Sequence, residues 1–529
     1  MYEKLFFSSI VLLIGFSLFC TSNLFVDSYI TPKWVYSLIF TGVCALIWAF
    51  SFIFKIKLNV DFLKIRNILI LSTCVEAFIG TFQYLYFLIT TNKVLQCAIR
   101  GTYDNPTGFA ASLCVVIPFV LELCRDSRLK NRRIGSLILC WFVLLLFLSG
   151  SRTAIVSILS LLVLCYCFDK KVFLKITKRT LIKTLLFFCL GIFFLTILYF
   201  IKKDSADGRL LIWNSTWKMI LENPILGYGI NGFKKNYMNF QAVYLKETID
   251  TSFLQLADDI RHPFNEILNI ATHFGIVGVL LLFLFLLGII LCYRFYPSNL
   301  GKSSLLSLFV IFLFSQFSYP FSYPFIWIVT LFACFVILHS WFINIIKKRK
   351  LRYVLVLLLF IFGCYSIHSG TRRLYGEFLW KEAVNLFSLG RRLKALDKYK
   401  ESYSVMKDNS YFLYNYAVAL YQSSDIDRSY QIAKRCNLYW ANYDLEVLLG
   451  LLCFEFKEYN KAEEHYKRAH WMCPCRFVPL EYLLDLYLEL GDTQKQIVLA
   501  QQIQKKVVKV DSERVRFIKN KAEIVLNCE

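Results

Sequence analysis

The chain is poor in the residues on which flexible and fibrous proteins depend. Glycine contributes 22 and proline 10 of the 529 residues, and only 18% of the chain is charged, against about a quarter in an ordinary soluble domain. Hydrophobic residues make up 57%, including 50 phenylalanines and 31 tyrosines. This composition excludes collagen-like, low-complexity and disordered classes. Because several apolar runs are long enough to cross a bilayer, the sequence predicts an integral membrane protein.

The charge is unevenly distributed and argues against a nucleic-acid partner. The formal net charge is +23, of which residues 371–529 contribute +4 from 25 basic and 21 acidic side chains. The remaining +19 lies in residues 1–370, in short basic clusters between the apolar runs. This arrangement is typical of the cytoplasmic loops of a multi-spanning membrane protein, so the lipid bilayer is an expected partner and nucleic acid is not.

The apolar runs predict eleven membrane spans, several of them short. They cover 5–22, 34–54, 67–90, 107–123, 134–149, 153–168, 181–201, 274–293, 304–319, 323–346 and 351–368. The first run resembles a signal peptide in its charged start, but no A-x-A-like cleavage site follows it. We therefore expect it to be a retained helix.

Basic residues mark every second loop and set the predicted orientation. They gather in loops 55–66, 124–133, 169–183 and 347–352, whereas the alternate short loops have almost none. The positive-inside rule then places the N-terminus in the cytoplasm. With eleven spans, the long loop 202–273 and everything after residue 370 lie outside the cytoplasm.

The C-terminal region shows a repeat with a period near 34 residues. Small or apolar residues recur in one series at Ala383, Ala417, Gly450 and Leu484, and in a second at Ala395, Ser429, Ala462 and Gln496. These offsets resemble the tetratricopeptide repeat, in which two antiparallel helices pack through small residues; an unrelated helical bundle is the alternative. Such a solenoid offers a concave surface for a peptide or protein partner.

The predicted fold is therefore all-α, with two domains. Residues 1–370 form a polytopic transmembrane bundle of about eleven spans, with the outer-face loop 202–273. Residues 371–529 form a soluble tetratricopeptide-like solenoid. Loop 202–273 carries eight basic and eight acidic residues, so its positive charges can act only individually.

The first of three motifs at the predicted outer face is Ser-Gly-Ser-Arg-Thr at 149–153. Arg152 stands there at the end of a span, where a guanidinium can simply snorkel to the interface. The alternative is that it lies over a groove and holds a phosphate by paired N–H donors.

The second motif is Gly-Arg-x-x-x-Trp at 208–213, followed by Asn-Pro-x-x-Gly-x-Gly at 223–229. A helix beginning near Arg209 would set Arg209 and Trp213 on one face. The proline would end this helix, and Gly227 and Gly229 would allow a tight turn near the membrane. The alternative is an interfacial helix anchored by its tryptophans.

The third motif is Arg-His-Pro-Phe-Asn-Glu at 261–266, which leads into His-Phe-Gly-Ile-Val-Gly at 273–278. A single histidine beside a membrane is more often structural than catalytic. Within this polar cluster, however, a neutral His262 could act as the general base for an alcohol, oriented by Asn265 or Glu266.

Taken in order, these motifs resemble the O-antigen ligase/polymerase superfamily, most specifically over residues 149–281. The common family form of the last motif is His-Asn-x-x-Leu, whereas here two residues separate His262 from Asn265. The resemblance implies a glycosyltransferase at the outer face of the bacterial inner membrane. It would move a glycan from undecaprenyl diphosphate to an acceptor, with inversion at the anomeric carbon.

The resemblance also assigns roles to individual residues. Arg152 and Arg209 would bind the donor diphosphate and stabilise its developing charge, and His262 would take the proton of the acceptor hydroxyl. Around these three catalytic residues, the residues expected to bind or support the substrates are Arg261, Asn265, Glu266, Trp213, Gly227 and Gly229.

We expect no metal ion and no other cofactor. The eighteen cysteines form no metal pattern, and most stand in apolar runs, where a thiol behaves as a small hydrophobe. The outer loops contain no convincing Asp-x-Asp, and the pair Asp258-Asp259 is typical of a solvated turn. A diphosphate is already a good leaving group, so no catalytic acid is needed.

Several acceptors stay open, and so do two interpretations outside the enzyme class: a transporter, and a catalytically inactive membrane anchor for the repeat domain. A ligase transfers finished glycan to lipid A core, a polymerase to another lipid-linked unit, and an oligosaccharyltransferase to protein. His262 together with arginines favours the ligase or the protein-glycosylating type, and the repeats could recruit a protein. A polysaccharide flippase is the transporter alternative, although transporters usually show repeated halves, and we see none.

Overall fold

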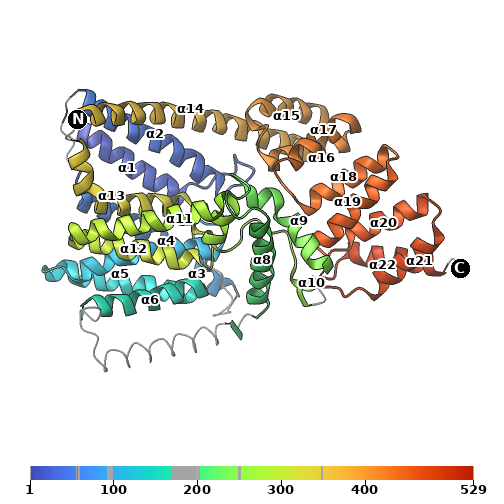
Figure 1. Cartoon of the computed structure of the whole chain (residues 1–529), viewed down its shortest axis with the longest axis horizontal. Helices are drawn as coiled ribbons and strands as arrows, with labels where there is room; N and C mark the ends of the chain where they lie inside the picture. Colours follow the sequence, from blue (N-terminus) through green and yellow to red (C-terminus); the bar gives the residue numbers. More distant parts are fainter. Residues whose placement is uncertain are drawn as a thin grey trace. The chain divides into compact units, whose positions relative to one another are not determined.

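The structure is a computed structural model that describes residues 2–54, 56, 60–91, 99–169, 199–200, 203–247, 252–346 and 349–527. Within these ranges every regular element is a helix (Figure 1). The all-α fold class predicted from the sequence is confirmed.

The chain divides into two compact units. The first comprises Met1–Phe194 and Leu281–Lys381, and the second comprises Leu195–Leu280 and Glu382–Glu529. The loop that the sequence assigned to the membrane domain thus groups with the C-terminal repeats. The division of the chain at residue 370 into a membrane domain and a repeat domain remains a prediction.

Ten of the eleven predicted spans fall on described helices. They are α1 (Tyr2–Phe19), α2 (Thr31–Ile53), α3 (Phe62–Thr91), α4 (Pro106–Cys124), α5 (Leu129–Leu148), α6 (Arg152–Asp169), α11 (Glu266–Phe295), α12 (Asn299–Ser315), α13 (Pro324–Ile346) and α14 (Arg349–Ser388). Eight of the ten are long and apolar enough to cross a membrane, while α6 and α12 contain shorter apolar stretches. Apart from residues 199–200, the predicted span 181–201 lies outside the described residues.

Helices α2 and α14 of the first unit approach each other through glycines. A Cβ atom added to Gly42 would lie 2.8 Å from the backbone oxygen of Gly363, and one added to Gly370 would lie 2.5 Å from Ile39. Lipid tails are as apolar as the surface of a membrane helix, so the hydrophobic effect does not drive helices together in a bilayer. Helices there associate through close packing of their backbones at small residues. This packing supports the membrane-bundle assignment.

The buried charges of the first unit are satisfied around Thr102. The ammonium of Lys33, 1% exposed, donates to the Thr102 carbonyl oxygen at 2.8 Å. The carboxylate of Glu76, 0% exposed, accepts from the Thr102 amide at 2.8 Å. Buried charged groups are costly unless they are paired or hydrogen-bonded in this way. The network therefore ties α2 and α3 to the turn before α4.

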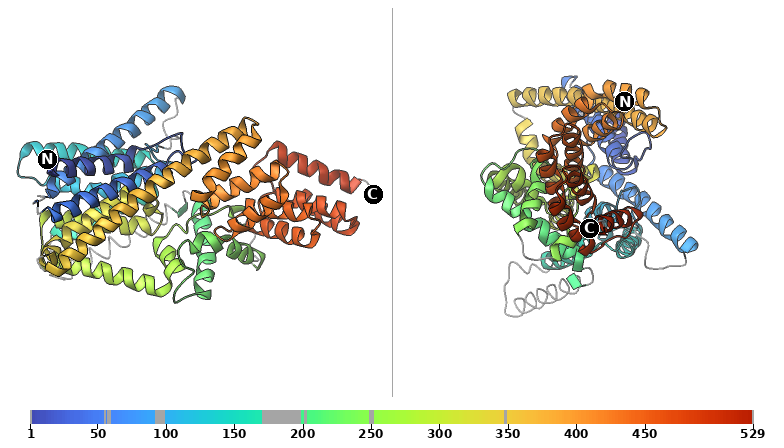
Figure 2. Two further views of the ribbon diagram at one scale, coloured as in Figure 1. Left: turned by 90° about the horizontal axis from the view of Figure 1, so that it is seen from above. Right: turned by 90° about the vertical axis from the view of Figure 1, so that its right-hand side faces the viewer.

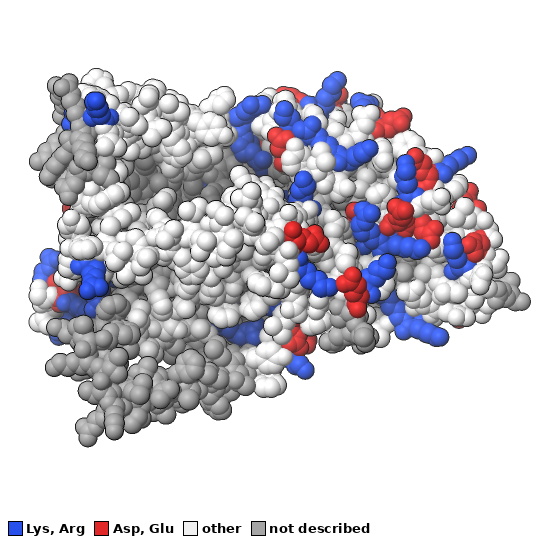
Figure 3. All heavy atoms as spheres, in the orientation of Figure 1, with Lys and Arg blue, Asp and Glu red and all other residues white. Residues whose placement is uncertain are grey.

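The repeat helices of the second unit follow one another in short antiparallel pairs (Figure 2). After the end of α14 they are α15 (Arg392–Met406), α16 (Ser410–Gln422), α17 (Ile426–Asn437), α18 (Tyr443–Glu455), α19 (Tyr459–Met472), α20 (Val478–Glu489), α21 (Thr493–Lys505) and α22 (Glu513–Asn527). On the face drawn in Figure 3, Lys, Arg, Asp and Glu crowd this region, as expected for helices exposed to water.

The two series of small residues meet inside the helix pairs, as the 34-residue period predicts. Ala417 and Ser429 are both 0% exposed, and the Ser429 hydroxyl donates to the Ala417 carbonyl oxygen at 2.8 Å. A Cβ atom on Gly450 would lie 2.4 Å from the ring of Tyr466. The tetratricopeptide-like assignment of this region is confirmed.

Candidate functional site

The second motif forms helix α8 (Lys203–Glu222), which ends just before Pro224 as the sequence predicts. Arg209 and Trp213, one turn apart on α8, reach the same neighbouring segment. The guanidinium carbon of Arg209 lies 5.5 Å from the ring centroid of Phe264. The indole N–H of Trp213 donates to the Pro263 carbonyl oxygen at 2.9 Å. The structure therefore brings the second motif directly onto the third.

Asn265 of the third motif caps the first turn of helix α11. Its side-chain oxygen accepts hydrogen bonds from the amides of Ile267 at 2.9 Å and Leu268 at 3.1 Å. Asparagine is a preferred N-cap, because this geometry satisfies amides that have no partner in the first helical turn. Asn265 thus begins α11 and fixes the direction in which the chain leaves His262.

Glu266 also acts within the first turn of α11. Its carboxylate accepts from the Asn269 side-chain amide at 2.9 Å, and its charge lies at the positive end of the helix dipole. Asn265 and Glu266 therefore have structural tasks in the second unit, and their roles towards a substrate remain predictions.

The glycine-rich loop after α8 is bound to a kink in α11 by backbone hydrogen bonds. The amide of Tyr228 donates to the Thr272 carbonyl oxygen at 2.8 Å, and the amide of Ile276 donates to the Pro224 carbonyl oxygen at 2.8 Å. At the kink, Gly275 has φ 62° and ψ −158°, a conformation open essentially to glycine alone. The loop and the kink hold each other in place.

Gly227 is required by this close approach. A Cβ atom on it would lie 2.7 Å from the carbonyl oxygen of Thr272, and its φ is +67°. Gly229, with φ +78°, has open space around its Cβ position and donates its amide to the His273 carbonyl oxygen at 2.9 Å. Both glycines shape the turn, and their contact with a substrate stays a prediction.

His262 is partly buried in the turn between α10 (Ser252–Leu256) and α11. Burial is the main cause that lowers the pKa of its imidazole to about 4, and the positive charges of Arg261 and Lys234 contribute to the same shift. At neutral pH the ring is therefore uncharged and keeps one nitrogen as a hydrogen-bond acceptor. That is the protonation state a general base needs.

Lys234 is the functional candidate that the sequence did not reveal. It stands on α9 (Gly232–Glu247) and reaches two aromatic rings of the repeat region, those of Tyr411 and Trp440. Nothing in the spacing of residues 230–240 distinguishes it from Lys235. Only a fold that joins positions nearly 200 residues apart could single it out.

Arg152 belongs to the first unit, at the start of α6. The turn before it contains Gly150 with φ +65°, and the Ser149 hydroxyl donates to the Leu146 carbonyl oxygen at 2.8 Å. Arg209 and the turn of His262 are brought together in the second unit. That Arg152 joins them remains a prediction.

A hollow of about 390 Å³ opens between α8 and the start of α11. Its lining combines aromatic rings with amide side chains and comprises Trp213, Asn214, Trp217, Asn265, Ile267 and Leu268. Apolar walls with a few polar groups are also found in small-molecule sites, but this hollow is shallow and widely open. Trp217 and Asn214 are neighbours that the motif alone did not indicate, although Trp217 follows Trp213 at helical spacing.

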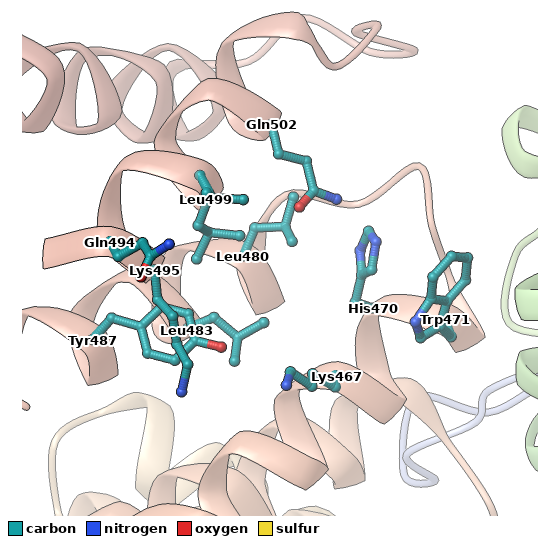
Figure 4. A pocket seen from close by; sticks show the side chains of 11 residues that line it. Lys467, His470, Trp471, Leu480, Leu483, Tyr487, Gln494, Lys495, Leu499 and Gln502 are labelled. Atoms are coloured by element: carbon teal, nitrogen blue, oxygen red, sulfur yellow. The ribbon is translucent and has the colours of Figure 1, made fainter. Parts of the chain in front are cut away.

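A second hollow of about 390 Å³ lies on the repeat helices α19, α20 and α21 (Figure 4). Lys467 and Lys495 stand at its edge near Tyr487, while His470 and Trp471 border it on α19. The two lysines form ion pairs, Lys467 with Glu463 at 2.6 Å and Lys495 with Asp492 at 3.4 Å. None of the residues of the three motifs lines this second hollow.

The described part of the chain contains no ready set of metal ligands. Across it, no group of three or more His, Cys, Asp or Glu side chains is placed to hold an ion. The pair Asp258-Asp259 has other partners. Asp258 forms an ion pair with Arg476 at 2.9 Å, and burial raises the pKa of Asp259 while attraction to Arg261 opposes that shift.

Comparisons with known proteins agree with the motifs. Residues 136–283, which contain all three motifs, match the family model described as O-antigen ligase. A Rickettsia conorii protein named "Putative polysaccharide ligase" is 36% identical over 87 residues, a match covering 16% of this chain and 19% of that protein.

Among solved structures, the crystal structure of the APC/C hetero-tetramer Cut9-Hcn1 aligns with 93% of this chain and 96% of that chain. Its sequence identity is 10% and its TM-score is 0.26, a value too low to support any argument. The resemblance predicted from the sequence is confirmed over residues 136–283.

Proposed function

We propose that this chain, whose residues 136–283 match the O-antigen ligase family, is a membrane glycan transferase of the ligase type. It takes a glycan from undecaprenyl diphosphate and transfers it to an acceptor hydroxyl, without a metal ion and with inversion. One observation carries the proposal. Arg209 and the turn of a neutral His262, more than 50 residues apart in sequence, meet through the contacts of Phe264 and Pro263.

The reaction is a single displacement. The acceptor hydroxyl oxygen attacks the anomeric carbon, its proton passes to the imidazole of His262, and the bond between that carbon and the diphosphate oxygen breaks. Negative charge grows on the leaving diphosphate, where the fixed guanidinium groups of Arg209 and Arg152 stabilise it. Attack opposite the leaving group inverts the anomeric centre.

The low basicity of His262 fits this order of events. An imidazole with a pKa of about 4 is a weak base in the empty site. A bound diphosphate brings negative charge close to the ring and favours its protonated form, which raises the pKa towards neutrality. The base therefore becomes competent when the donor is in place, which limits proton transfer before binding.

The proposed location is the bacterial inner membrane, with the active loop and the repeats in the periplasm. The Ala441 amide donates to the Lys234 carbonyl oxygen at 3.2 Å, which requires both segments to lie on one side of the membrane. Four apolar helices, α11 to α14, separate the two segments. An even number of crossings returns the chain to the same side, which supports the part of the proposal that puts the active loop and the repeats together.

The acceptor is proposed to be lipid A core, with another lipid-linked unit or a protein hydroxyl as alternatives. The glycolipid profile of a strain carrying His262→Ala separates them. Long glycan retained on undecaprenyl diphosphate, beside bare core, indicates the ligase. Core with a single unit indicates a polymerase, and loss of glycoprotein alone indicates transfer to protein. An unchanged profile in all three would contradict the enzyme proposal.

A further inference from the structure

Lys234 is held between the active loop and the repeat helices. Its ammonium nitrogen lies 3.8 Å from the ring centroid of Tyr411 and 5.5 Å from that of Trp440. Its backbone oxygen accepts from the amide of Ala441 at 3.2 Å. An aromatic face attracts a cation without cancelling its charge. The two rings therefore fix the position of the ammonium and leave it cationic.

Arg261 shares one of these rings. Its guanidinium carbon lies 5.2 Å from the centroid of Tyr411, so two positive groups from different parts of the loop meet at a single side chain of α16. Both charges act on His262, whose pKa they help to lower. Asp259 is an acidic group that attracts Arg261. Positive charge thus gathers around the turn that carries the proposed base.

The repeat helices also hold the loop through buried contacts of α9 and of the segment before His262. Gln241, 0% exposed, donates from its side-chain nitrogen to the Met472 carbonyl oxygen at 2.7 Å. Cys475 contacts the Ala257 carbonyl oxygen at 3.4 Å. The packing of α9 against α19 buries Tyr237 and Met472 completely or nearly so. These contacts make the repeats part of the structure of the active loop.

We propose that Lys234 is a further cationic residue of the donor-diphosphate site. Its positioning residues are Tyr411 on α16 and Trp440 in the connection between α17 and α18. The inference rests on the proposed function and adds a residue and a role that the motifs do not assign. A diphosphate carries at least two negative charges. Lys234 and Arg261, which share the ring of Tyr411, would supply it with more positive charge than the Arg209 of the motif does alone. The repeat domain then completes the site instead of only recruiting a partner.

The test measures binding of undecaprenyl diphosphate to the purified full chain in nanodiscs of phosphatidylcholine. Lys234→Gln is compared with Lys235→Gln, an exposed neighbour on the same helix. We expect Lys234→Gln to weaken binding by about tenfold, the effect of losing one charge-assisted contact. Lys235→Gln binds as the wild type does, and Lys234→Arg retains most of the affinity.

Two variants of Tyr411 test the positioning role. Tyr411→Phe keeps the aromatic face and is expected to bind as the wild type does, whereas Tyr411→Leu removes it and weakens binding as Lys234→Gln does. A purely structural role would instead lower the thermal stability of both Lys234→Gln and Tyr411→Leu without a change in diphosphate affinity of the folded fraction. That result would overturn the inference.

The outcomes separate this inference from the proposed function. If Arg209→Gln weakens binding while Lys234→Gln equals Lys235→Gln, the inference about Lys234 is wrong and the proposed function stands. If the wild type binds undecaprenyl diphosphate no better than undecaprenol, both are wrong. If phosphatidylglycerol displaces the probe at equal concentration, the site recognises lipid phosphate in general, which also contradicts a donor site.

Discussion

The indole nitrogen of Trp213 donates a hydrogen bond to the carbonyl oxygen of Pro263 at 2.9 Å. This bond joins α8 to the residue directly after His262. A buried carbonyl that loses its only strong donor is costly, so the bond fixes the turn on the helix that carries Arg209. The contact therefore helps to hold the turn of the proposed base against the helix of the proposed phosphate ligand.

Replacing Trp213 with phenylalanine removes the donor but keeps an aromatic ring. We expect the rate of glycan transfer to fall by about tenfold, because a turn shifted by even an ångström loses alignment with the reacting groups. The control is Leu221→Ala on the same helix, since Leu221 is 60% exposed and does not line the hollow beside Trp213. Equal rates for both variants would show that the Trp213 bond does not position the site.

Gly275→Ala should prevent correct folding of the active loop. A Cβ atom there would lie 2.1 Å from the Ile225 carbonyl oxygen, and the backbone has φ +62°, which alone costs a larger residue about 1–3 kcal/mol. The matched control is Gly288→Ala, on the same helix with nothing within 4 Å of the added atom. The yield of monodisperse protein in size-exclusion chromatography measures the difference. Comparable yields would contradict the described kink.

The pH dependence of transfer should report His262 in two ways. In the enzyme without substrate, the pKa of the His262 imidazole is about 4. We therefore expect kcat/KM to stay level from pH 8 to pH 5 and to fall only as the pH approaches 4, where the ring gains a proton. The bound diphosphate raises this pKa, so kcat should begin to fall at a higher pH than kcat/KM does. A fall of kcat/KM near pH 6.5 would mean an exposed, ordinary histidine.

The attachment of the repeats should depend on buried contacts more than on surface charge. Gln241→Leu leaves the Met472 carbonyl oxygen without its donor and is expected to lower the unfolding free energy by about 1–3 kcal/mol. Arg476→Gln removes the ion pair with Asp258, whose partners are 42% and 53% exposed, and should change it by less than about 1 kcal/mol. Thermal unfolding of the two purified variants gives the comparison.

The sequence predicted the elements that depend on local periodicity. The spans appear as apolar runs, and the contact of Ser429 with Ala417 follows from the 34-residue spacing. The extent of α11 was missed, because the polar first turns from Glu266 onward precede the apolar run that begins near residue 274. The same applies to α14, which continues to Ser388 because no proline interrupts it after the apolar run.

The sequence could indicate only some residues of the candidate site, for a related reason. Arg209, Trp213 and His262 stand in motifs whose order is informative. Lys234 depends on Tyr411 and Trp440, which are nearly 200 residues away. The spacing of Asn265 from His262 departs from the family form, and the structure accounts for the position of Asn265 by its capping of α11. Tertiary contacts of this kind leave no local signal.

The most direct test of the account is transfer by the purified full chain. The assay supplies a glycan on undecaprenyl diphosphate and a lipid A core acceptor, with a chelator present, and compares the wild type with His262→Ala and Arg209→Gln. The account predicts that the wild type releases undecaprenyl diphosphate and extends the core at an unchanged rate in the chelator. Both variants should be slower by at least about a hundredfold. Full activity of His262→Ala would contradict it.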